Sequence, residues 1–155
     1  MTILSEMSSP SPTLIPVHGA WHSPYHFEKI LPLLASHNLR IATADPPTTH
    51  GDASISFSDD VIYIEKLIQT EVELGNKVVL VGHSYGSALA QSAVKRYKNE
   101  IQALVLISAF FKETGETQLQ SMGGTVSVST VAEGDGRFQC YHSHLHFSDS
   151  KIVSP

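Results

Sequence analysis

Residues 78–90 read VVLVGHSYGSALA, and this stretch says more about the architecture than any other part of the chain. Four Val or Leu residues precede its first glycine, as expected of a strand that is buried on both faces. Three small residues follow its second glycine within four positions and suit a helix packed closely against a sheet. The pattern predicts a strand, a tight turn and a helix that present the Ser84 hydroxyl above the sheet, an arrangement called a nucleophile elbow.

The turn itself has a clear physical requirement. It forces Ser84 into a sparsely populated backbone conformation. Glycine at positions 82 and 86 allows the strand and the helix to approach without clashes between Cβ atoms. Gly-x-Ser-x-Gly alone occurs by chance in about one chain in twenty of this length, so the flanking pattern is what gives the motif its weight.

Composition limits the classes of protein that fit. The 155 residues allow one domain with a real core, and 41% hydrophobic and 16% charged residues indicate a globular chain. The net charge is −5, and the only basic run, residues 95–98, lies at a predicted helix end, so nucleic acid is not an expected partner. The single Cys140 excludes an intrachain disulfide. No apolar run reaches the roughly 18 residues of a membrane span, residues 1–12 do not resemble a signal peptide, and we expect a cytoplasmic protein.

Strand and helix patterns alternate along the first two thirds of the chain. We expect strands at 13–17, 39–44, 77–81 and 101–109, and helices at 23–38 (bent at Pro32), at 58–75, and from the elbow to about residue 98. This order predicts a three-layer α/β/α sandwich with a mostly parallel sheet. The strand at 101–109 would then be an edge strand with two apolar faces, so we expect the isolated chain to be poorly soluble or to need a partner.

The pattern weakens after Phe111. Residues 125–131 alternate Val with Ser or Thr, and the turn signal at 134–136 indicates a small hairpin or an irregular tail. We therefore divide the chain into a disordered tail (1–12), a partial domain (13–124) and a C-terminal segment (125–155). His142, His144 and His146 alternate there, but no carboxylate or thiolate stands at ligand spacing, so we expect an exposed polar tail and no metal.

Four short pieces together resemble a known family. They are VHGAWH at 17–22, ADPP at 44–47, FSDDV at 57–61 and GHSYG at 82–86. In order and spacing they resemble the α/β-hydrolase superfamily, and within it the compact group of plant methylesterases, hydroxynitrile lyases and their bacterial and fungal esterase relatives. ALVLISAF at 103–110 is similar to the strand that follows the elbow helix in that group. The resemblance runs from residue 13 to about 124 and implies the N-terminal part of an α/β-hydrolase fold.

The resemblance also implies roles for particular residues. Ser84 would be the nucleophile, and the backbone N–H groups of Ala20 and Tyr85 would form the oxyanion hole. The substrate would be a small ester, hydrolysed without a cofactor. Three further residues are candidates for lining the pocket: His18, Gly19 and His83.

The acid and the base of a catalytic triad are not assigned. In this fold they follow later strands, in the order Ser, acid, His, and each βα step takes about 30 residues. Only 46 residues follow Ala109, without an apolar run fit for a central strand, so we expect the chain to be the N-terminal part of a longer domain. Charged or polar surface use is expected for the remaining candidates, which are Glu113, Asp135, Asp149, His22, His26, His37 and His50.

Three functions stay open at this point. The first is a carboxylesterase-like serine hydrolase acting on a small ester. The second is a non-catalytic binding or remnant protein that keeps the elbow. A hydroxynitrile lyase is the third, and it is disfavoured because Ala20 stands where we would expect a hydroxyl side chain. The sequence leaves the oligomeric state open.

Overall fold

The computed structural model describes residues 11–52, 54–109 and 111, together with the backbone of residues 130–132 and 138–140. Its main feature is a four-stranded sheet. The strands are β1 (Thr13–Val17), β2 (Arg40–Ile41), β3 (Val78–His83) and β4 (Ile101–Ile107). Their order across the sheet is β2-β1-β3-β4, and every neighbouring pair is parallel. This confirms the predicted parallel α/β architecture.

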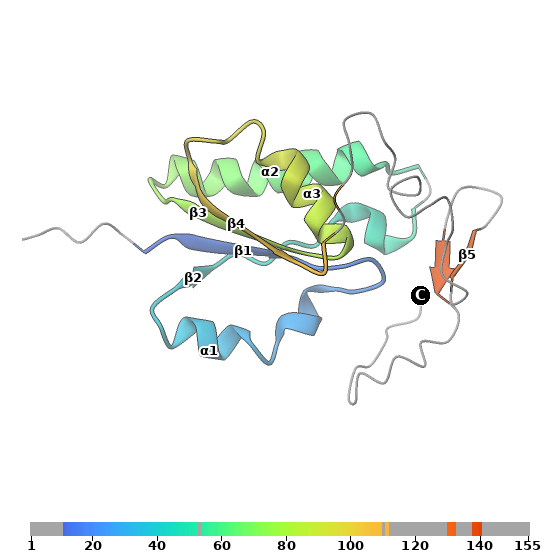
Figure 1. The fold of residues 1–155 in the computed structure, drawn as a ribbon, viewed down its shortest axis with the longest axis horizontal. Coiled ribbons are helices and arrows are strands. Elements are labelled where there is room, and N and C mark those ends of the chain that lie inside the picture. Colours follow the sequence, from blue (N-terminus) through green and yellow to red (C-terminus); the bar gives the residue numbers. More distant parts are fainter. Residues whose placement is uncertain (1–10, 53, 110, 112–129, 133–137, 141–155) are drawn as a thin grey trace, which may run out of the picture.

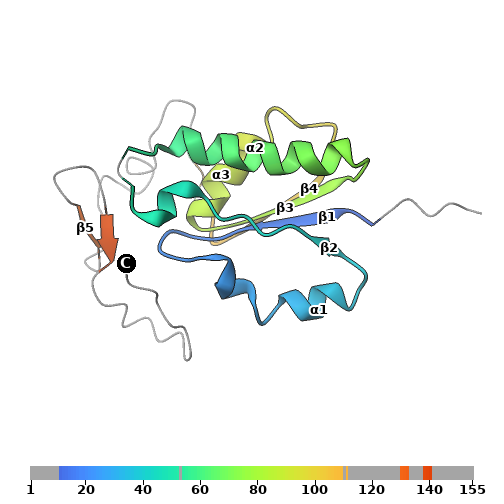
Figure 2. The same ribbon diagram turned by 180° about the vertical axis from the view of Figure 1, so that it is seen from behind.

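Helices lie on both sides of this sheet. Helix α2 (Phe57–Glu73) and helix α3 (Tyr85–Ala93) cover one face, while α1 (Leu31–Ala35) lies on the other side, near β2 (Figures 1 and 2). Two short 3-10 helices, η1 (Pro24–Phe27) and η2 (Pro47–His50), follow β1 and β2 respectively. The three-layer arrangement therefore has its long helices on a single face.

The hydrophobic core lies between the sheet and the α2–α3 layer. Alternate residues of the two central strands point into it, because successive side chains of a strand face opposite ways. The fully buried apolar side chains of the sheet and the two helices are Ile15, Val17, Val78, Leu80, Ile64, Ile68, Leu89, Ala90 and Ala93. Burial of this set is the main force that fixes β3 and α3, and so the turn between them, in place.

The opposite face is less covered at β4. Val81 pairs with Val105 and His83 with Ile107, so these four residues share that face. Val105 and Ile107 remain 43% and 49% exposed. Within the described residues β4 has a neighbouring strand on one side only. Among the described residues β4 is therefore the edge of the sheet, as predicted.

Several predicted element boundaries were wrong. The expected helix over 23–38 is instead the 3-10 helix η1 followed by the five-residue helix α1. Pro32 explains the break, because proline lacks a backbone N–H and fits only the first turn of a helix, where it lies in α1. The expected strand 39–44 is two residues long, and Ala44 adds only an isolated bridge to Val17.

Further boundaries differ: β3 covers Val78–His83 instead of 77–81, and β4 ends at Ile107 instead of residue 109. Helix α2 begins at Phe57, one residue earlier than predicted, because Ser56 caps it through a reciprocal pair with Asp59. Within the predicted loop 48–57, η2 adds a turn of 3-10 helix. The elbow helix α3 ends at Ala93 instead of near residue 98.

The C-terminal segment contains a second, separate sheet. Strands β5 (Thr130–Ala132) and β6 (Phe138–Cys140) pair antiparallel, with Val131 opposite Gln139. They flank the turn signal at 134–136, which agrees with the predicted hairpin. In the part of the chain that the structure describes, no helix combines the length and the apolar character needed to cross a membrane.

Candidate active site

Ser84 occupies the turn between β3 and α3 with φ 51° and ψ −118°, a conformation that a non-glycine residue rarely adopts. Hydrogen bonds fix the turn on both sides. The Ser84 N–H donates to the Ile107 carbonyl at 3.0 Å, and the Ser84 carbonyl accepts from the N–H and the hydroxyl of Ser87 at 2.9 and 2.5 Å. Strained residues persist only where their surroundings determine them so fully, and they concentrate at functional sites.

Gly82 and Gly86 are both required because other backbone segments pass too close to them to leave room for a side chain. A Cβ on Gly82 would lie 2.6 Å from the Ser87 Cα. A Cβ on Gly86 would collide with the Val17 carbonyl oxygen and lie 2.6 Å from that of His18. The helix after the elbow therefore packs directly on the end of β1, as the sequence motif predicts.

The loop after β1 lies against the elbow. A Cβ built on Gly19 would be 3.2 Å from the Ser84 Cβ and 3.2 Å from the His83 Nδ1. Tyr85 follows Ser84 directly, and Ala20 follows Gly19, so the structure brings the segments of both predicted oxyanion donors to the same serine. Their roles as donors stay a prediction.

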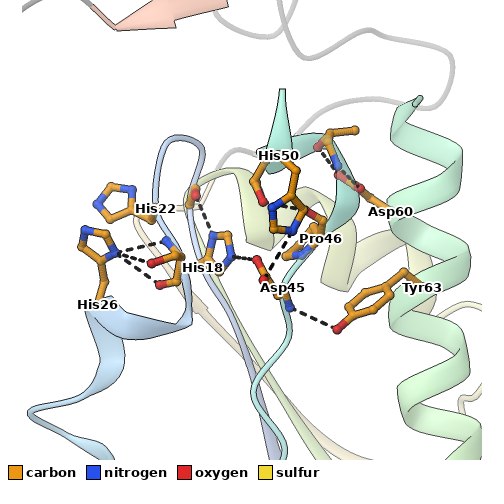
Figure 3. A network of polar contacts seen from close by, with 12 residues as sticks. His18, His22, His26, Asp45, Pro46, His50, Asp60 and Tyr63 are labelled. Atoms are coloured by element: carbon orange, nitrogen blue, oxygen red, sulfur yellow. Dashed lines mark hydrogen bonds and ion pairs between the residues drawn. The ribbon is translucent and has the colours of Figure 1, made fainter. Parts of the chain in front are cut away.

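His18 is a buried structural residue at the base of this loop. It is 1% exposed, and its Nδ1 lies 2.9 Å from the Gly19 carbonyl oxygen. A carbonyl only accepts, so Nδ1 carries a proton. Its Nε2 faces the Asp45 Oδ1 at 3.5 Å, and neither atom has a hydrogen-bond partner in the described structure (Figure 3).

Asp45 is a site residue that sequence reasoning missed. The His50 Nε2 lies 3.4 Å from the Asp45 Oδ2 (Figure 3). The backbone N–H of Asp45 donates to the Tyr63 hydroxyl at 3.3 Å. A signal was available, because Asp45 follows the strand next to β1. Carboxyl ends of neighbouring parallel strands meet at one edge of a sheet, where open α/β sheets bind their ligands.

Imidazoles gather beside the elbow. The His22 ring lies 4.5 Å from that of His26 and 5.9 Å from that of His83, both edge-on. Burial lowers the pKa of His83, and the neighbouring His22 and His18 lower it further. Burial also lowers the pKa of His26, again with a contribution from His22. The sequence predicts ordinary polar use for His22 and His26, so their clustering beside the elbow was not predicted.

Other predicted features are outside this site or outside the described residues. No group of three or more His, Cys, Asp or Glu side chains in the described part of the chain could hold a metal ion. The alternating histidines at 142–146 and the three carboxylates weighed as triad acids lie outside the described residues. His37 lies beyond α1 on the surface.

Comparison with known proteins identifies the family. A family model described as the alpha/beta hydrolase family matches residues 17–144, which is most of the chain. The chain therefore belongs to the alpha/beta hydrolase family. Within that family, its relatives place it in the methylesterase-like group, as the resemblance in its motifs predicts.

Two curated relatives illustrate the match. Methylesterase 2 of Arabidopsis thaliana is 34% identical over 103 residues, which cover 63% of this chain and 39% of the relative. A carbendazim hydrolyzing esterase of Nocardioides sp. is 28% identical over 127 residues, which cover 79% of this chain and 52% of the relative. The chain thus spans between about two fifths and one half of the length of these two relatives.

Solved structures confirm the fold. The crystal structure of polyneuridine aldehyde esterase matches with a TM-score of 0.62 at 22% identity, covering 74% of this chain and 46% of the other. Tomato methylketone synthase I matches with a TM-score of 0.61 at 20% identity, over the same fractions. At these identities the likeness supports the α/β-hydrolase fold and nothing finer.

Proposed function

We propose that this chain carries the nucleophile and oxyanion-hole part of a serine carboxylesterase that acts on a small ester. The observation that carries the proposal is the strained Ser84, placed between a strand and a helix with the Gly19 loop against it. An ester substrate is supported by the relatives, which are methylesterases and a carbendazim hydrolyzing esterase.

In this mechanism the Ser84 hydroxyl oxygen attacks the ester carbonyl carbon and its proton passes to a base. The backbone N–H groups of Tyr85 and Ala20 stabilise the oxyanion of the tetrahedral intermediate. When the intermediate collapses, the ester C–O bond breaks and the base returns the proton to the departing alcohol. Water then attacks the acyl-serine, which releases the carboxylic acid and restores the Ser84 hydroxyl. Gly19 and His83 adjoin the serine and would line the pocket, while the buried His18 would support the loop through its hydrogen bond to the Gly19 carbonyl.

The second candidate function is a non-catalytic binding protein. One observation favours it: among the described residues, no hydrogen bond joins the Ser84 hydroxyl to an imidazole. A serine without such a base is a weak nucleophile.

A fluorophosphonate probe separates the two functions, because it labels only an activated serine. For the esterase we expect labelling of the full chain on Ser84, read by intact mass and peptide mapping, and none in Ser84→Ala. Ser92→Ala is the matched control on the same helix and should label normally, since its hydroxyl bonds only the Ala88 carbonyl. Ester hydrolysis should fall at least about 10³-fold in Ser84→Ala. Labelling of Ser84 that is lost in Ser84→Ala would overturn the binding function.

A further inference from the structure

The buried carboxylate of Asp60 is a feature that the proposed mechanism does not use. Asp60 lies in the first turn of α2, and it is fully buried. Its Oδ1 accepts from the Thr48 N–H at 2.9 Å, and its Oδ2 accepts from the hydroxyls of Thr48 and Tyr85 at 2.5 and 2.7 Å. Three donors from two other segments therefore converge on one carboxylate.

Capping of α2 does not explain this arrangement. The helix already has a complete capping box, in which Ser56 and Asp59 each bond the backbone N–H of the other. Asp60 is not part of that box, and its oxygens are occupied by η2 and by the start of α3. A buried charge is costly unless it is fully hydrogen-bonded, and here the bonds reach across the fold to the residue after the nucleophile.

Tyr85 is held at both ends. Its backbone belongs to the elbow, and its ring contacts Phe57 edge-on with centroids 6.1 Å apart. Its hydroxyl is fixed by Asp60. Burial raises the pKa of that hydroxyl, and the hydrogen bond to Asp60 also raises it, so the phenol stays protonated and donates. As the first residue of α3, Tyr85 has no acceptor within the helix for its own backbone N–H.

We propose that Asp60 is a positioning residue for the oxyanion hole, which it orients through the Tyr85 hydroxyl. The carboxylate fixes the far end of the Tyr85 side chain, and this limits rotation of the peptide whose N–H would bind the oxyanion. Thr48 in η2 holds the carboxylate in place by donating two hydrogen bonds to it. The segments η2, α2 and α3 together therefore orient the backbone N–H of Tyr85. The proposal rests on the proposed esterase function for its chemical consequence, but the mechanical link to the elbow can be tested without it.

The chemical test compares Tyr85→Phe, which removes one hydroxyl, with Tyr97→Phe in the full chain. Tyr97 follows the far end of α3 and is the matched control. Saturating fluorophosphonate should label Ser84 at least tenfold more slowly in Tyr85→Phe and in Asp60→Asn. The fluorophosphonate concentration that gives the half-maximal labelling rate should stay within twofold of that of the natural chain. The variants still bind the probe and lose only stabilisation of the transition state. Labelling of both folded variants at the natural rate would overturn the proposal.

The mechanical test does not depend on activity. Amide hydrogen exchange over residues 84–88 should be at least tenfold faster in Tyr85→Phe and Asp60→Asn than in Tyr97→Phe, while exchange over β1 is unchanged. Unchanged exchange at the elbow would overturn the positioning role even if the chain were inert. A natural chain that fails to label but shows this pattern would refute the esterase function and leave the positioning role supported. Uniformly faster exchange over the whole chain would show that Asp60 only stabilises the fold, and it would also overturn the proposal.

Discussion

On one side of Ser84, the Tyr85 hydroxyl donates one hydrogen bond to the buried carboxylate of Asp60, which accepts two more from Thr48, all at 2.9 Å or less. On the other side, the Gly19 loop is held by His18, whose Nε2 faces Asp45 at 3.5 Å without a hydrogen bond. The hydrogen bonds to Asp60 restrict the orientation of the Tyr85 side chain, because a hydrogen bond weakens steeply when its angle departs from linear. The second side has hydrogen bonds within the loop, from the rings of His18 and His22 to the carbonyls of Gly19 and Ala20, but its contact with the rest of the site, between His18 and Asp45, is looser. The difference teaches that the two segments proposed to supply the oxyanion donors are positioned by unlike contacts, which should respond differently to mutation and pH.

The largest effect is expected where the two sides touch, at Gly86. In Gly86→Ala the new methyl group would meet the carbonyl oxygens of Val17 and His18, neither of which can move without disturbing β1. We expect a loss of about 3 kcal/mol or more in the free energy of unfolding, measured by urea denaturation. Gly75→Ala is the control, since Gly75 has φ +81° but open space around it, and it should lose only about 1 kcal/mol. Equal losses would mean that the elbow and the loop do not pack as described.

Asp60→Asn should produce the next largest effect. The Thr48 N–H needs an oxygen acceptor, so the new side-chain amide must keep its oxygen at the position of Oδ1 and place its nitrogen at that of Oδ2. The hydroxyls of Thr48 and Tyr85 then lose their charged acceptor. We expect the unfolding free energy to fall by about 2 kcal/mol. Urea denaturation measures it, and a loss below about 0.5 kcal/mol would contradict the description of Asp60 as a pure acceptor.

The same substitution at Asp45 should cost less. The His18 Nε2 has no hydrogen-bond partner in the described structure, and with the ring proton on Nδ1 an amide nitrogen at position 45 can donate to it. Asp45→Asn should therefore change the unfolding free energy by less than about 1 kcal/mol. A loss of several kcal/mol would show instead that the two sides are held by equally demanding interactions. Nitrogen-15 NMR of the His18 ring checks the assumed proton on Nδ1 independently.

The smallest effect concerns pH. The pKa values of His83 and His26 are lower in the folded chain than the ordinary value of 6.5. Below that value the unfolded chain binds more protons than the folded one, so stability should decline as the pH falls from about 7.5 to 5.5. His83→Gln should flatten this decline, as measured by urea midpoints at the two pH values. Asp60→Asn should leave the slope unchanged over this range, because among the described residues the hydrogen bonds of the Asp60 carboxylate come from Thr48 and Tyr85, and neither titrates between these pH values. A steeper slope in His83→Gln would reverse the assignment.

Local sequence predicted the central part of the fold well. The apolar run before Gly82 and the small residues after Gly86 could only fit a buried strand and a closely packed helix, and β3 and α3 form as expected. Boundaries were less predictable. The break between η1 and α1 depends on which side of Pro32 the helix begins, and the short β2 depends on how far the chain after α1 can follow β1.

The sequence predicted some residues of the candidate site but not the contacts that surround them. Ser84, Ala20 and Tyr85 follow from a contiguous motif and a loop after a strand, and such local patterns carry over to structure. The partnership of His18 with Asp45, the imidazole cluster around His22 and the bonds of Asp60 join residues that are distant in the chain.

The sequence by itself determined that a strained serine stands between two glycines at the end of a buried strand, because steric limits on the backbone act between near neighbours. Only the tertiary structure decided what surrounds that serine. The parallel sheet brings the ends of β1, β2 and β3 to one edge, and α2 adds its first turn beside them. Hydrogen bonds and buried charges act over a few ångströms, so the residues that position the site become known only when packing has set those distances.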